Sequence, residues 1–387
     1  MVSDMIHTEN FKTKTMLLER DNHTRSRWNI GLDIGYSAVK GFSPNTVFCF
    51  PAFAKRVPEQ YLSVARAKDS DIQYKDLDTG EIWNVGESAQ EMSGTNDNEL
   101  AVYGRVRYFN KMFKVISEVG MGIGMLENKY GKIGNASPFV QTGLPPEYRI
   151  SDESDLKEAL AGKHHFAIKI GEQEWKEFNF ELPIENIDVI DQPMGTLFSI
   201  STLNNGRTSV DAAKYFNSNI LIADAGFGTL DVYNINKGRV ATRPETIDNL
   251  GMKQVFKETI HEIFEKYKKE ITVSEMQKLL QTGKFRQILK QGNKRISKEI
   301  DFADILERNN EKVCTDMLTH ICSAYNNLID HDYLVITGGT CNAWSNIIRD
   351  YFSGMETLKV ISGAQNDNLS AVFANARGYY MYALNKR

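Results

Sequence analysis

Residues 29–40, Asn-Ile-Gly-Leu-Asp-Ile-Gly-Tyr-Ser-Ala-Val-Lys, join a short apolar run to a turn of small residues. The apolar run predicts a buried strand that carries Asp33 near its end, and residues 39–42 predict a strand that returns from the turn. We therefore expect a β-hairpin. Gly35 in its turn lets the backbone approach a phosphate closely, and Lys40, seven residues after Asp33, can add a positive charge.

The same plan recurs at residues 218–231, Ser-Asn-Ile-Leu-Ile-Ala-Asp-Ala-Gly-Phe-Gly-Thr-Leu-Asp. A buried strand again ends in an aspartate, Asp224, and Thr229 offers a hydroxyl that can hydrogen-bond a terminal phosphate. The turn between the two strands holds Gly226, Phe227 and Gly228. Because Mg²⁺ prefers one or two carboxylates together with waters and phosphate oxygens, we expect Asp33 and Asp224 on facing hairpins to hold it through water.

A third strand runs into glycines at residues 333–339, Tyr-Leu-Val-Ile-Thr-Gly-Gly, and Thr340 follows. Gly338 and Gly339 could simply begin the helix expected from about Ala343, although such a turn also suits a ligand. Each of the three turns alone is a common tight turn. Their order and spacing fit two duplicated lobes, and together they predict a phosphate-binding cleft. No GxxxxGK[ST] motif occurs in the chain, so the site is not a P-loop.

Length and composition limit the alternatives. A chain of 387 residues is longer than one compact core usually holds, so two domains with a cleft are expected. The net charge of −4 argues against a broad nucleic-acid-binding face, so any DNA contact should be indirect. The four cysteines have no CxxC spacing and predict buried thiols and not a zinc site. No apolar run is long enough to span a membrane, and we expect a cytoplasmic protein.

The rest of the chain falls into three parts. Residues 1–28 are mostly polar and predict a flexible or loosely docked extension, with the fold starting at Asn29. Residues 249–331 are charged, with apolar positions three to four residues apart, and predict a helical subdomain. Residues 369–384 predict a closing helix.

The three glycine turns, within residues 29–40, 218–231 and 333–340, resemble the phosphate-1, phosphate-2 and adenosine motifs of the actin, sugar-kinase and heat-shock-chaperone ATPase superfamily. The resemblance extends over residues 29–387. Three further segments, 142–148, 192–195 and 373–378, resemble ParM/StbA plasmid-segregation proteins, and the last two would connect the lobes. The resemblance implies an α/β, actin-like, two-lobed fold of duplicated ribonuclease-H-like domains, each with a five-stranded sheet.

The resemblance also implies the domain boundaries and the partners. An extension of residues 1–28 would precede domain I, formed by residues 29–201 and 364–387, and domain II would span residues 202–363 with a helical subdomain at about 250–332. The protein would bind ATP, or GTP, with Mg²⁺ and hydrolyse it. It would form a helical filament with itself and reach plasmid DNA only through a ParR-like DNA-binding adaptor, without a membrane.

Some site residues follow from the resemblance alone. Gln192 falls where family members position the attacking water, although it could also be a turn residue before Pro193. Lys253 and Gln254, after Leu250-Gly251, fall where relatives contact the ribose. One departure concerns the first loop, because Tyr36 stands between Gly35 and the hydroxyl of Ser37, whereas many actins place the hydroxyl directly after the glycine. This leaves open which group meets the β-phosphate.

Two other functions fit the same superfamily. A small-molecule kinase would need a general base facing the γ-phosphate. Gln192 cannot be that base, and Asp191 would point to the opposite side if both lie on a strand. A chaperone-like or FtsA-like protein would need a C-terminal substrate domain or an amphipathic membrane helix, and residues 381–387 give only a weak one. The filament-forming ATPase remains the preferred interpretation, with the kinase as its alternative.

Overall fold

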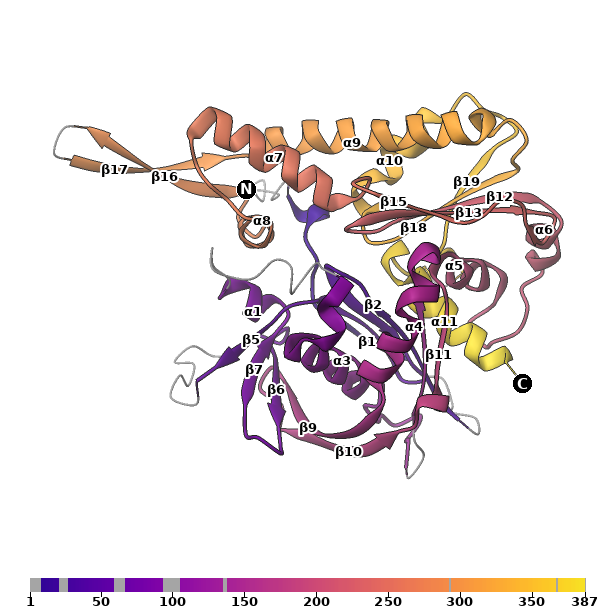
Figure 1. The fold of residues 1–387 in the computed structure, drawn as a ribbon, viewed down its shortest axis with the longest axis horizontal. Helices are drawn as coiled ribbons and strands as arrows, with labels where there is room; N and C mark the ends of the chain where they lie inside the picture. The colour runs from indigo at the N-terminus through magenta and orange to yellow at the C-terminus, as the bar shows by residue number, and fades with distance from the viewer. Residues whose placement is uncertain are drawn as a thin grey trace.

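The computed structural model describes residues 8–20, 27–58, 67–92, 105–134, 138–291, 294–366 and 368–386. Two lobes, each built on a mixed β-sheet, lie one above the other in Figure 1. Helices α5 (Gln192–Ser201) and α11 (Ala374–Asn385) lie between them.

The first lobe is built on a six-stranded sheet with the strand order β1-β4-β3-β2-β8-β11. Its central strand β2 is buried along its whole length, as its apolar sequence predicts. Strands β2, β8 and β11 run parallel, so their carboxyl ends meet at one edge of the sheet. The strands are β1 (Met16–Glu19), β2 (Trp28–Ile34), β3 (Ala38–Phe42), β4 (Thr46–Pro51), β8 (Pro138–Leu144) and β11 (Ile187–Asp191).

A second sheet of five strands, in the order β10-β9-β6-β7-β5, completes this lobe. Helix α3 packs between the two sheets and shares one apolar core with both. The strands are β5 (Ala54–Val57), β6 (Ile72–Asp76), β7 (Ile82–Val85), β9 (Gly162–Ile170) and β10 (Lys176–Leu182). The helices are α1 (Glu87–Glu91), η2 (Arg105–Phe109), α3 (Lys111–Gly124), α4 (Pro146–Leu160), η3 (Ile184–Asn186) and η5 (Ala371–Phe373). The short helix η1 (Glu9–Phe11) precedes β1 and contacts α10 of the second lobe.

The second lobe is built on the sheet β14-β13-β12-β18-β19, with β15 also paired to β13. Helices α7, α9 and α10 contribute to the core on one side of it, and α5 packs on the other. The strands are β12 (Asn219–Ala225), β13 (Thr229–Asn236), β14 (Arg239–Val240), β15 (Glu245–Asp248), β18 (Tyr333–Thr337) and β19 (Lys359–Ser362). The helices are α6 (Ala212–Phe216), α7 (Met252–Tyr267), α8 (Val273–Leu279), α9 (Ala303–Ala324), η4 (Asn326–Leu328) and α10 (Cys341–Tyr351).

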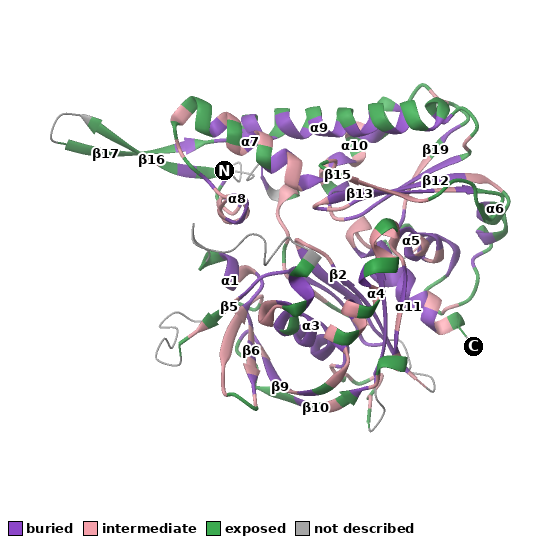
Figure 2. Cartoon of the chain, in the orientation of Figure 1, coloured by how far each residue is buried: buried purple, intermediate pink, exposed green. Residues whose placement is uncertain are grey.

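The predicted helical region contains a β-hairpin that the sequence interpretation missed. Strands β16 (Lys284–Gln291) and β17 (Lys294–Asp301) form a separate two-stranded sheet that projects from the second lobe beside α7 (Figure 1). Phe285 and Ile300 are buried at its base, whereas most of its length is exposed (Figure 2). An exposed hairpin has little apolar periodicity, which is why the sequence pattern did not reveal it.

The expected N-terminal extension is docked where the structure describes it. Residues 16–19 form β1, which adds to the edge of the first sheet through antiparallel pairing with β4. Trp28 already belongs to β2, one residue before the expected start of the fold. Residues 1–7 and 21–26 lie outside the described residues. The prediction of a loosely held extension therefore fails for β1, because backbone pairing overrides the polar character of this segment.

Helices α5 and α11 make the closest contact between the lobes. α11 packs on β2 of the first lobe, and α5 packs through Leu197 and Ile200 on the second sheet. A Cβ on Gly378 would lie 1.6 Å from the carbonyl oxygen of Gly195, so the two backbones meet where only glycine fits. Helix α5 also contacts β8 and β11 of the first lobe, so it lies between the lobes, just before the expected boundary at residue 202.

Two predictions from composition can be compared with the structure. All four cysteines, Cys49, Cys314, Cys322 and Cys341, are free and buried, as expected. Among the described helices, none has the length and apolar character that crossing a membrane requires.

Candidate functional site

A cavity of about 290 Å³ lies between the lobes and brings the three predicted loops together. It is lined by all of the predicted site residues except Lys253 and Gln254. Those residues are Asp33, Gly35, Tyr36, Ser37, Lys40, Gln192, Asp224, Gly226, Phe227, Gly228, Thr229, Gly338, Gly339 and Thr340. The strand-to-turn pattern thus located the cavity from the sequence.

The first two loops have the same backbone geometry. The N–H of Gly35 donates to the carbonyl oxygen of Ala38, and the N–H of Gly226 donates to that of Thr229, both at 2.9 Å. In each hairpin the aspartate pairs with the residue seven positions later, so Asp33 lies opposite Lys40 and Asp224 opposite Asp231. The two hairpins therefore share their strand register as well as their sequence pattern.

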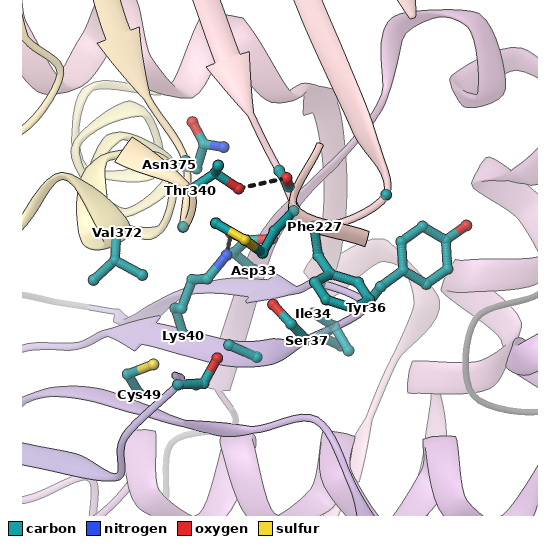
Figure 3. Close-up of a pocket in the computed structure, with 18 of the residues that line it drawn as sticks. Asp33, Ile34, Tyr36, Ser37, Lys40, Cys49, Phe227, Thr340, Val372 and Asn375 are labelled. Carbon is teal, nitrogen blue, oxygen red and sulfur yellow. Dashed lines mark hydrogen bonds and ion pairs between the residues drawn. The ribbon is translucent and has the colours of Figure 1, made fainter. Parts of the chain in front are cut away.

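The first hairpin carries a buried ion pair. Lys40 Nζ lies 2.9 Å from Asp33 Oδ2, and both side chains are almost fully buried. Burial alone would lower the pKa of Lys40, but Asp33 outweighs it and the pKa is raised. Lys40 is therefore charged in the cavity. Figure 3 shows this pair between Cys49 on one side and Thr340 and Asn375 on the other.

The second hairpin holds two buried acids in place of an ion pair. Burial raises the pKa of Asp224 to about 6, with a further contribution from nearby Asp33, while Asn375 and Lys40 act in the opposite direction. Burial and then Asp224 raise the pKa of Asp231 well above its usual range. Two facing acids close together resist ionising at the same time. A divalent cation or a positive ligand group would relieve this repulsion.

Asn375 connects the second hairpin to the helices between the lobes. Its Nδ2 donates to Asp224 Oδ2 at 2.5 Å, and its Oδ1 accepts from Thr196 of α5 at 2.8 Å. Neither contact was predicted, although residues 373–378 were expected to connect the lobes. A buried amide in the last helix gives no sequence signal for such a role.

Arg107 holds the backbone of the first loop. It donates to the carbonyl oxygens of Ile34 at 2.6 Å and Gly35 at 2.9 Å, and its guanidinium lies 4.4 Å from the centre of the Tyr36 ring. Tyr36 in turn packs against the core of the second lobe, where a Cβ on Gly228 would lie 3.2 Å from its ring. The tyrosine that departs from the actin pattern therefore spans the cleft. The sequence did not predict Arg107 because it lies far from the loop along the chain.

The third loop closes against the second. Gly338 has a φ of +94°, and a Cβ there would lie 2.3 Å from the carbonyl oxygen of Ala225. The hydroxyl of Thr340 donates to the carbonyl oxygen of Gly226 at 2.7 Å. A side chain at position 338 would push these two loops apart.

Lys253 and Gln254, the two residues expected at the ribose, do not line this cavity. The N-terminus of α7 is held on the second loop, where the N–H of Lys253 donates to the carbonyl oxygen of Phe227 at 2.7 Å. Lys253 lines a neighbouring hollow together with Tyr36 and Tyr148. The side chain of Gln254 donates to Glu258 along the same helix, and Gln254 is not among the residues that line either space.

Gln192 is the first residue of α5 and lines the cavity directly after β11 ends. Asp191, the last residue of β11, is held at 3.0 Å by Arg149 and is not among the cavity-lining residues. Gln192 thus starts a helix, and this differs from the expectation that both residues lie on a strand. The two side chains nevertheless have different surroundings, because Gln192 lines the cavity and Asp191 pairs with Arg149.

Comparisons with known proteins agree with this geometry. Residues 31–195 match the family model described as "Actin like proteins N terminal domain". Among solved structures, a non-polymerisable quadruple mutant of pCBH ParM is 19% identical, with a TM-score of 0.68, and the match covers 93% of this chain and 100% of that one. A 15-stranded ParM filament from Clostridium botulinum is 18% identical, with a TM-score of 0.67 and coverage of 94% and 100%. No curated protein matches the chain by sequence.

The fold is therefore actin-like, with two lobes around a cleft, as the sequence motifs predict. A third structure, the archaeal actin homologue Ta0583, has a TM-score of 0.62 at 15% identity and covers 93% of this chain and 100% of its own. The resemblance to ParM plasmid-segregation proteins is thus confirmed at the level of the fold.

Proposed function

We propose that this protein is a nucleotide-dependent, filament-forming ATPase of the ParM type that drives plasmid DNA segregation. The observation that carries the proposal is the pair of matching hairpin turns, 35–38 and 226–229, that face one cavity between two lobes. Their backbone amides suit phosphates, and the cavity between the lobes suits a nucleotide. ATP is the expected nucleotide, with GTP as the alternative.

The buried acids fit a magnesium ion. Asp33 and Asp224 are almost fully buried, line the cavity and come from facing hairpins. They would hold Mg²⁺ through water, and the ion would neutralise charge on the phosphate oxygens. Gln192 would accept a hydrogen bond from the attacking water and align it with the terminal phosphate. Lys40 Nζ lies 2.9 Å from Asp33 Oδ2 and would keep that carboxylate in place for this role.

The alternative of a small-molecule kinase has less support. Such an enzyme needs a general base within hydrogen-bond reach of the substrate hydroxyl. Asp191, the candidate considered from the sequence, is paired with Arg149 and lies outside the lining of the cavity. Gln192 cannot accept a proton. With Asp191 outside the cavity, hydrolysis by an aligned water remains the preferred proposal over transfer to a second substrate.

The proposal includes filament formation by contacts between identical subunits. Identical subunits joined head to tail, without closure of a ring, form helical filaments. One of the similar structures is itself a 15-stranded ParM filament. We expect a ParR-like adaptor to link the filament to plasmid DNA in the cytoplasm, because the net charge of −4 disfavours direct DNA binding by the whole surface.

The β16–β17 hairpin is the expected contact with a neighbouring subunit. Residues 284–301 contain six basic and two acidic residues, a formal charge of +4 in a chain whose net charge is −4. Lys290 lies opposite Arg295, and the exposed Leu289 lies opposite the exposed Ile296. Like charges directly opposite each other destabilise a hairpin, so an acidic surface of a second copy would stabilise this one.

Reversing both charges tests this contact. The variant Lys290→Glu/Arg295→Glu keeps a like-charged cross-strand pair but changes its sign. We expect the critical concentration for assembly to rise about tenfold or more, with nucleotide affinity unchanged, because the interface would then bring like charges together. The control Lys132→Glu/Lys163→Glu reverses two exposed charges on the first lobe. An unchanged critical concentration in the hairpin variant would exclude this contact.

Sedimentation tests the proposed function as a whole. The purified chain is spun at high speed with Mg-ATP, with Mg-GTP and without nucleotide, over a range of protein concentrations. We expect pelleting only with nucleotide and only above a critical concentration. Nucleotide binding without pelleting at any concentration would rule out the filament and lead to a search for kinase substrates.

A further inference from the structure

The segment 8–16 crosses from one lobe to the other at the cleft. Thr8 is fully buried, and its hydroxyl donates to the carbonyl oxygen of Leu280 in the second lobe at 2.7 Å. Phe11 packs against the core of that lobe. Figure 1 shows this indigo segment descending from the upper lobe to the lower one. Its first half is thus anchored on the second lobe.

Its second half is anchored on the first lobe. The N–H of Thr15 donates to Glu87 Oε1 at 2.5 Å, and Met16 pairs with Cys49 as β1 joins the sheet. Next to it, Gln90 of α1 donates to Gln277 of α8 at 3.2 Å, a second connection between the lobes. The segment is therefore a strap, defined here as residues 8–16, that ties the lobes together.

The strap also forms a wall of the cavity. Asn10, Phe11, Lys12, Thr13 and Lys14 line the same space as the three loops. On the second lobe, Met252, Phe256 and Leu280 face that space near Phe11's packing partners. The cavity is thus enclosed by three parts of the chain, two lobes and the strap.

The basic residues of the cavity show what the strap adds. Among the described lining residues, four are basic: Lys12, Lys14, Lys40 and Arg107. Lys40 is paired with Asp33, and Arg107 donates to backbone carbonyls of the first loop. A nucleoside triphosphate brings several negative charges into a cavity that already holds buried acids. Lys12 and Lys14 of the strap contribute two of these four positive charges to the lining of the cavity.

We propose that the strap is part of the nucleotide site, with Lys12 and Lys14 attracting the phosphates and Phe11 forming an apolar wall. The strap thereby retains the nucleoside triphosphate in the cleft. This inference rests on the proposed nucleotide-binding function. It assigns a binding role to residues that the sequence placed in a flexible or loosely docked extension.

Binding and release of a fluorescent ATP analogue test the strap. In the full-length variant Lys12→Ala/Lys14→Ala we expect the Kd for the triphosphate to rise about tenfold, with a faster dissociation rate and a smaller change for the diphosphate. Phe11→Ala should weaken the binding of the triphosphate and of the diphosphate to a similar extent. The control Lys132→Ala/Lys163→Ala should bind as the unmodified chain does.

The possible outcomes distinguish a failure of the strap proposal from a failure of the proposed nucleotide-binding function. If the unmodified chain binds the analogue and the strap variants bind it equally well, the strap is not part of the site. Tighter binding by the variants would mean that the strap obstructs the cavity, which also overturns the proposal. If the unmodified chain binds no nucleotide, the proposed function fails and this inference fails with it. Thermal unfolding of each variant checks that it is folded.

Discussion

Replacing Gly378 with alanine is expected to destabilise the folded protein by about 3 kcal/mol, because the new methyl group has no space. Its Cβ would lie 1.6 Å from the carbonyl oxygen and 2.3 Å from the carbonyl carbon of Gly195. Both contacts are with backbone atoms, which cannot move aside as the end of a flexible side chain can. Helices α5 and α11 would have to separate, and with them the lobes.

Urea unfolding of the variant measures this effect. The matched control is Gly354→Ala, because a Cβ on Gly354 would meet no atom within 4 Å. We expect the control to unfold close to the unmodified chain and Gly378→Ala to unfold at a clearly lower urea concentration. Equal midpoints for the two variants would show that the helices do not meet as described.

Replacing Lys40 with methionine is expected to cost about 3 kcal/mol or more of stability, because it leaves Asp33 buried without its counter-charge. Asp33 Oδ2 accepts from Lys40 Nζ at 2.9 Å, and both residues are buried in the wall of the cavity. The variant should also lose affinity for Mg-ATP, since the cavity would lose a positive charge. Urea unfolding and nucleotide titration measure the two effects.

A double variant separates stability from function at this pair. Asp33→Asn/Lys40→Met removes both charges, so it should regain most of the stability lost in Lys40→Met. Nucleotide affinity should remain low, because the charge and the carboxylate at the phosphate loop are both absent. A double variant that regained full affinity would show that the pair only stabilises the fold.

The helices between the lobes connect the site to the orientation of the lobes. Asn375 of α11 contacts both Asp224 in the cavity and Thr196 of α5. Arg377, fully buried, donates to the carbonyl oxygens of Ser199 and Thr202 at the end of α5. A ligand that changes the contacts of Asp224 therefore acts on the packing of two helices that carry one lobe each. This arrangement gives a physical basis for the proposed nucleotide-dependent assembly.

The sequence predicted the loops because their signal is local. A buried apolar strand, an aspartate at its end and a glycine turn lie within about ten residues each, and the register that places Lys40 opposite Asp33 follows from a tight hairpin. Finding that device twice suggested two lobes, and the resemblance to actin-like ATPases supplied the description of the fold.

Other parts of the site depend on contacts between distant residues. Arg107 reaches the first loop across more than seventy residues, and Asn375 reaches Asp224 across 151. Their residue types give no hint of such partners. The strap was misread because its docking uses backbone pairing and single side chains, and the β16–β17 hairpin because most of it is exposed. Gln254 was assigned from a short motif and points along α7.

Light scattering and phosphate release, recorded together after addition of Mg-ATP to the unmodified chain and to Gln192→Ala, test the central claim most directly. We expect scattering to rise in both samples and to decay only in the unmodified chain as phosphate appears, because the variant assembles but cannot align the attacking water. Phosphate release without any rise in scattering, or equal release from both samples, would contradict the account of this chain as an ATPase that assembles with nucleotide and uses Gln192 to hydrolyse it.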